Sequence, residues 1–74
     1  MAEDFVRIEV ALDGGQILSA LVTAESADAL DRALRAGSAG TVELSSEDAS
    51  IVLVLPRVLY VKRFARETRV GFKA

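Results

Sequence analysis

Apolar and polar residues alternate over two segments near the start of the chain, and a turn signal separates them. In Phe5–Leu12 every second residue is apolar, which is typical of a strand with one buried face. Asp13-Gly14-Gly15 follows, and glycine accepts the positive φ angles that tight hairpin turns require. Gln16–Thr23 resumes as a strand with apolar residues on both faces. The pattern predicts a β-hairpin over residues 5–23.

The next segment has the spacing of a short amphipathic helix. Its apolar residues recur three or four positions apart and form a narrow stripe: Ala27, Leu30, Ala33 and Leu34. Thr23 or Ser26 can cap the start of the helix, and Gly37 is placed to end it in the left-handed conformation. We therefore expect a helix over residues 26–36.

The second half of the chain reads as three further strands, at residues 41–45, 50–55 and 59–64. The run Ile51–Leu55 is apolar on both faces, which is typical of a strand buried from both sides. Pro56 lacks a backbone N–H, so that strand has to end there.

A last segment, residues 66–72, is predicted to dock as an edge strand, on its own sheet or on a neighbour's. Val70 and Phe72 would point the same way on an extended chain, and the free energy of burying apolar side chains favours docking. The alternative is a free basic tail.

These elements give the order β-β-α-β-β-β in one domain covering residues 1–74. The order predicts an α+β fold with a mainly antiparallel sheet and one short helix; closure into a small barrel is the alternative. A single short helix covers only one face of such a sheet, and a chain this short buries only ~60% of its unfolded surface. The surplus apolar face therefore predicts a second copy of the chain as partner. The candidate interface residues are Leu18, Val22, Val52, Val54, Val70 and Phe72.

Composition argues against catalysis. The sequence has no histidine and no cysteine, which excludes histidine-dependent triads, thiol nucleophiles and zinc–thiolate sites. The carboxylates lack the spacing of an EF-hand, so we expect no metal site, no cofactor and no enzymatic activity. No apolar run exceeds five residues, and the first residues lack the features of a signal peptide. We therefore expect a cytoplasmic protein without a membrane segment.

Charge is distributed unevenly along the chain. Residues 1–50 hold ten acids and three bases, whereas residues 51–74 hold six bases and one acid. The basic end either binds an anionic partner or folds back on the acidic half, in the same copy or in a neighbouring one.

The basic end also mixes aromatic and cationic side chains. On an extended strand Tyr60, Lys62, Phe64 and Arg66 would share one side, as in surfaces that stack bases and hold phosphates. The candidate nucleic-acid-binding residues are Tyr60, Lys62, Arg63, Phe64, Arg66 and Arg69. The alternative is that the two aromatic residues belong to the core and that the charges protect a sheet edge from aggregation.

Two resemblances add to these patterns. The order of Thr41–Leu44, Leu59–Val61 and the ending Arg69–Phe72 resembles a family of small uncharacterised proteins of high-GC Gram-positive bacteria, over about residues 26–72. That resemblance implies the same fold and a cytoplasmic location, without an activity.

The second resemblance is to the tryptophan RNA-binding attenuation protein, a ring-forming all-β RNA binder. Asp4–Val6, Ile8 and Ala11-Leu12 resemble its opening, and Tyr60 with Lys62 and Arg63 resembles its basic RNA face, whereas the helical segment departs from its all-β pattern. The leading hypothesis is a non-enzymatic homo-oligomeric module that acts through protein contacts. The alternative is a module that binds single-stranded nucleic acid.

Overall fold

The structure, a computed structural model, describes residues 4–64. Its elements run in the predicted α+β order: β1 (Phe5–Leu12), β2 (Gln16–Thr23), α1 (Ala24–Arg35), β3 (Thr41–Ser45), β4 (Ser50–Val54), a 3₁₀ turn η1 (Leu55–Arg57) and β5 (Val58–Arg63). Helix and strand boundaries lie within two residues of those expected from the sequence. The predicted edge strand at residues 66–72, with Val70 and Phe72, lies outside the described residues.

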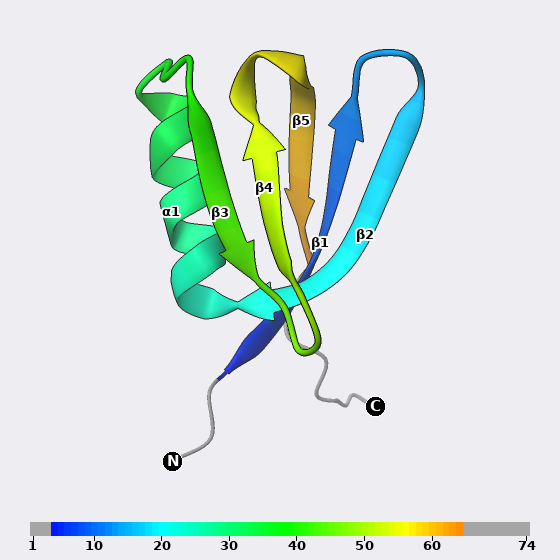
Figure 1. Cartoon of the computed structure of the whole chain (residues 1–74), viewed down its shortest axis with the longest axis vertical. Coiled ribbons are helices and arrows are strands. Elements are labelled where there is room, and N and C mark those ends of the chain that lie inside the picture. The colour runs from blue at the N-terminus through cyan, green and yellow to red at the C-terminus, as the bar shows by residue number, and fades with distance from the viewer. Residues whose placement is uncertain (1–3, 65–74) are drawn as a thin grey trace, which may run out of the picture.

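The five strands form two antiparallel sheets (Figure 1). The larger sheet has the order β2-β1-β5, and β3 pairs with β4 as a separate hairpin. Over residues 4–64 the sheets join through one bridge, between Val22 and Ser46, while η1 carries the chain from β4 to β5. The expected break at Pro56 is this turn, because proline suits the first positions of a helical turn. In the described part of the chain the two sheets therefore do not close into the small barrel of the alternative prediction.

Glycines with positive φ angles lie at the first hairpin turn and at the end of the helix, where the sequence predicted them. Gly14 and Gly15 have φ angles of 90° and 86°, which a residue with a Cβ rarely adopts, so the three-residue turn between β1 and β2 depends on them. Gly37 has a φ of 72° and ends α1. The N–H groups of Gly37 and Ser38 donate to the carbonyls of Leu34 and Ala33, which is the hydrogen-bond pattern of a Schellman motif.

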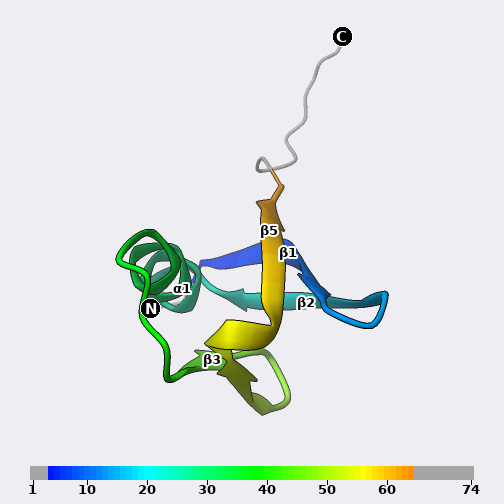
Figure 2. The same cartoon turned by 90° about the horizontal axis from the view of Figure 1, so that it is seen from above.

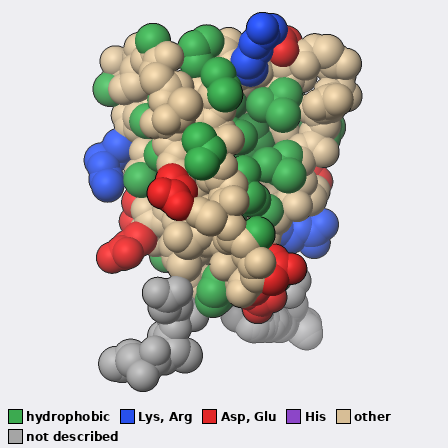
Figure 3. Space-filling model, in the orientation of Figure 1, with side chains coloured by type: hydrophobic (Ala, Val, Ile, Leu, Met, Phe, Trp, Pro, Cys, Tyr) green, Lys and Arg blue, Asp and Glu red, His purple; other side chains and the backbone are tan. Residues whose placement is uncertain are grey.

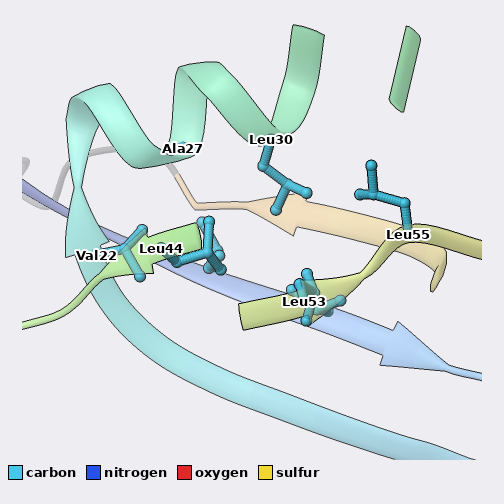
Figure 4. Packing of buried hydrophobic residues seen from close by; sticks show 8 residues of the cluster. Val22, Ala27, Leu30, Leu44, Leu53 and Leu55 are labelled. Carbon is cyan, nitrogen blue, oxygen red and sulfur yellow. The ribbon is translucent and has the colours of Figure 1, made fainter. Parts of the chain in front are cut away.

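The hydrophobic core lies between the two sheets and is closed at the side by α1 (Figure 2). Buried side chains from every described element except β5 meet there: Ile8 and Val10 from β1, Val22 from β2, Ala27 and Leu30 from α1, Leu44 from β3, Leu53 from β4 and Leu55 from η1 (Figure 4). Val58 and Val61 of β5 pack against this cluster and are partly buried. Because the inner faces of both sheets share this core, their outer faces point away from each other.

The prediction that Ile51–Leu55 is buried on both faces is wrong. Ile51 and Leu53 face the core, but Val52 and Val54 are 62% and 49% exposed. The reason is that α1 packs at the side of the core, against β3, β1 and β2, and leaves the outer face of the hairpin uncovered.

A buried serine links the start of α1 to the hairpin. Thr23, not Ser26, is the N-cap: its hydroxyl accepts the Ser26 N–H at 3.1 Å. The Ser26 hydroxyl in turn accepts hydrogen bonds from the Thr23 hydroxyl and from the Ser45 N–H, each at 2.9 Å. One side chain thereby satisfies a backbone donor at the end of β3 and orients the cap.

Replacing Ser26 by alanine should lower the free energy of unfolding by about 1–3 kcal/mol, because the Ser45 N–H and the Thr23 hydroxyl would lose their partner. Urea denaturation measures this change. Ser38→Ala, at an exposed loop position, is the control and should change stability by less than about 0.5 kcal/mol. Equal stability of the two variants would contradict the role assigned to Ser26.

Candidate interaction surfaces

The three-stranded sheet presents one face to the core and the other to solvent. Cross-strand partners share a face, so the register sets out the exposed side in rows: Tyr60, Ala11 and Ile17; then Lys62, Glu9 and Ser19; then Phe64, Arg7 and Leu21. We call these nine residues the sheet face. Three large apolar side chains remain about half exposed there: Ile17, Leu21 and Tyr60. Ile17 and Tyr60 flank the buried Ala11.

A bulge in β5 decides which of its residues reach the sheet face. Leu12 pairs with Val58 and Ala11 with Tyr60, so Leu59 is an extra residue without a partner in this register. The shift turns Tyr60 and Lys62 outward and turns Val61 and Arg63 toward the core side. The strand pattern had placed Tyr60, Lys62 and Phe64 on one side, and the structure brings these three together.

The sheet face carries both apolar and charged groups. The Arg7 guanidinium lies 5.0 Å and the Lys62 ammonium 5.4 Å from the centre of the Phe64 ring, both within the range of a cation–π contact. The Lys62 ammonium also lies 3.8 Å from a carboxylate oxygen of Glu9. Phe64 is thus engaged by cations of its own chain, and Tyr60 is the more accessible ring.

The basic residues of the described C-terminal third pair with acids of the first half. Arg57 contacts Asp13 at 3.1 Å, and Arg63 contacts Asp28 at 2.8 Å; Lys62 contacts Glu9 as above. For these three bases the structure shows the second of the two interpretations, in which the basic end folds back on the acidic half of the same chain. Arg66 and Arg69 lie outside the described residues.

Arg63 does not share the sheet face with Tyr60, Lys62 and Phe64, the other described residues of the predicted nucleic-acid-binding set. It lies across from Ile8 in the register, on the side of the sheet that faces α1, where Asp28 holds its guanidinium. The sheet face therefore offers Arg7, which the sequence reasoning did not single out, in place of Arg63.

The outer side of the β3–β4 hairpin is a second exposed surface, which we call the hairpin face. Its residues are Thr41, Glu43 and Ser45 from β3 and Ser50, Val52 and Val54 from β4. Figure 3 shows hydrophobic side chains gathered over β4 and beside it, toward β2. The segment around it, residues 36–56, contains three acids and no base, and within residues 4–64 none of these acids forms an ion pair.

The four described residues of the predicted oligomer interface differ in exposure. Val52 and Val54 are exposed on the hairpin face, as an interface requires, but Leu18 packs against the core and Val22 is fully buried within one copy. The prediction for Val22 is wrong because its partner in β1 is Val6, whose side chain points inward. Ile17 and Leu21 are the exposed large apolar residues of β2, and the register set by the Asp13-Gly14-Gly15 turn could have identified them.

A small cavity of about 120 Å³ lies between α1 and β5. It is mostly apolar, with two charged residues in its lining: Ile8, Ala27, Leu30, Asp31, Leu34, Val61 and Arg63. Among residues 4–64 no three acidic side chains are grouped so that they could hold a metal ion, and no helix is long and apolar enough to cross a membrane.

Comparison of this chain with protein-family models, with curated proteins and with solved structures finds no match. The two resemblances drawn from the sequence therefore stay predictions, and function has to be argued from the two faces.

The ion pair between Arg63 and Asp28 joins β5 to α1, and both side chains are about half exposed. A double-mutant cycle with Arg63→Gln and Asp28→Asn should give a coupling energy of about 0.2–1 kcal/mol, because solvent screens such a pair. Thermal or urea unfolding of the four proteins measures it. A coupling energy of zero would show that the contact does not hold β5 against the helix.

Proposed function

We propose that this protein is a non-enzymatic module that self-associates and acts through protein contacts. The observation that carries the proposal is the sheet face, on which Ile17, Leu21 and Tyr60 are about half exposed although a buried core lies beneath them. Ile17 and Tyr60 share one row, and Leu21 lies two rows away, beyond the row of Lys62 and Glu9. Clustered exposed apolar residues rimmed by polar ones are typical of interaction sites. The sequence supplies neither an imidazole nor a thiol, which supports a role in binding over one in catalysis.

A second copy is the partner that fits this surface with the fewest assumptions. The sheet face places a base, Lys62, beside an acid, Glu9, so it can meet a protein surface of mixed charge. Its aromatic residues and Arg7 belong to the types enriched in protein interfaces. The small size of the chain adds to this, because assembly buries apolar surface that a 74-residue domain cannot bury alone.

Single-stranded nucleic acid is the second candidate partner. Tyr60 is half exposed and shares the sheet face with Phe64, Lys62 and Arg7, which is the combination of rings and cations that such a ligand needs. The ion pairs of Lys62 and Arg57 with acids weaken this alternative, because paired bases are less available to phosphates. Titration with random single-stranded RNA and DNA at low salt tests it: micromolar binding that falls steeply with salt would favour nucleic acid over self-association as the function of this face.

Light scattering on the purified protein at tens of micromolar should give a mass of a dimer or larger. Ile17→Glu should raise the dissociation constant at least tenfold, because assembly would bury an unpaired carboxylate. Ser38→Glu, which adds the same charge at an exposed loop position that belongs to neither face, should leave the mass unchanged. A monomeric wild-type protein would overturn the proposal.

A further inference from the structure

In residues 4–64 the sheet face and the hairpin face both expose apolar side chains, and they point in opposite directions. The inner sides of the larger sheet and of the hairpin pack into one core, so the sheet face and the hairpin face lie on opposite sides of that core (Figure 2). Val52 and Val54 on the hairpin face are about as exposed as Ile17 and Leu21 on the sheet face. A contact that uses only one of these surfaces leaves the other in water.

The two surfaces differ in charge. Arg7 on the sheet face forms a cation–π contact but no ion pair within residues 4–64, and Lys62 beside it is held only at 3.8 Å by Glu9. On the hairpin face Glu43 lies directly across from Val52 and accepts a hydrogen bond from Ser50, without a base nearby in the described chain. Glu47 and Asp48 in the adjoining turn add to the same sign of charge.

This difference disfavours contacts between like surfaces. Two hairpin faces would bring their unpaired acids together. Two sheet faces, each with two bases and the single acid Glu9, would bring together two surfaces of net positive charge. Like charges in an interface are costly. A hairpin face against a sheet face sets Glu43 of one copy toward the cations of the other and buries apolar residues on both sides. Val52 and Val54 can then cover Ile17, Leu21 and Tyr60.

We infer that the protein assembles head to tail, with the hairpin face of one copy seated on the sheet face of the next. This inference rests on the proposed self-association and names its geometry. Such a contact is heterologous, because each copy contributes a different surface, and the resulting dimer retains one free surface of each kind for further neighbours. Assembly beyond a dimer follows from the same contact without a new interface.

Two charge-introducing variants test this geometry by complementation. Ile17→Glu places a carboxylate in the apolar part of the sheet face only, and Val54→Glu places one in the hairpin face only. Both residues are about half exposed, so neither substitution should unfold the chain. Each variant alone should be monomeric by light scattering. An equimolar mixture should form a 1:1 heterodimer and no larger species, because one intact hairpin face meets one intact sheet face.

The outcomes distinguish a wrong head-to-tail geometry from the absence of self-association. If the wild-type protein assembles but the mixture stays monomeric, or if only one of the variants dissociates, the head-to-tail contact is wrong and self-association stands. If the wild-type protein is a monomer, both are wrong. Circular dichroism of each variant checks folding; a variant that unfolds is replaced by Leu21→Glu for the sheet face or Val52→Glu for the hairpin face.

The salt dependence gives a second readout that needs no variant. Since opposite charges meet in the head-to-tail contact, raising the salt concentration from 0.05 M to 0.5 M should raise the dissociation constant of the wild-type protein several-fold. A dissociation constant that falls or does not change would overturn the inference, because a contact between like surfaces gains from screening.

Discussion

The packing of the β3–β4 hairpin against the larger sheet is the contact on which the rest of the structure depends. Leu44 and Leu53 from the hairpin meet Ile8, Val10 and Val22 from the sheet, and these side chains supply most of the fully buried apolar volume. Since the sheets join through a single strand bridge in the described residues, the hydrophobic contact rather than the ladder holds them together. The helix fits at the side of this pair, with Ala27 and Leu30 in the core.

That arrangement determines which surfaces remain for function. A helix laid over an outer face would have hidden either Val52 and Val54 or Ile17 and Leu21, whereas a helix at the side hides neither pair. The acids of α1 and of the first hairpin neutralise Arg57, Lys62 and Arg63, so most of the basic charge in the described C-terminal third is used within the chain. Arg7 and the acids of the second hairpin form no ion pair within residues 4–64.

Local patterns predicted the elements well because local chemistry determines them. The three-residue turn at Asp13-Gly14-Gly15, the end of α1 at Gly37 and the break at Pro56 each follow from the backbone properties of one or two residues. Alternation likewise placed Tyr60, Lys62 and Phe64 on one side of β5.

Features that depend on tertiary contacts were not predictable in the same way. Val54 belongs to a strand with two apolar faces, so periodicity cannot say which face turns inward; the packing of the β3–β4 hairpin against the larger sheet, with α1 at the side, decides it. The bulge at Leu59 and the pairing of Arg63 with Asp28 arise where β5 meets β1 and α1, far apart in sequence. Ser26 could be recognised as a cap candidate, but its bond to the Ser45 N–H follows only from the packing of the hairpin against the helix.

The central claim is that the two outer faces, and not the helix, are the surfaces through which copies of this protein meet. A dilution series of amide ¹H–¹⁵N spectra tests it most directly, because it reports on every backbone position of the unaltered chain. The account predicts concentration-dependent shifts or broadening at amides of the sheet face and of β4, with the exposed side of α1 unchanged. Spectra that do not depend on concentration, or changes centred on α1, would contradict it.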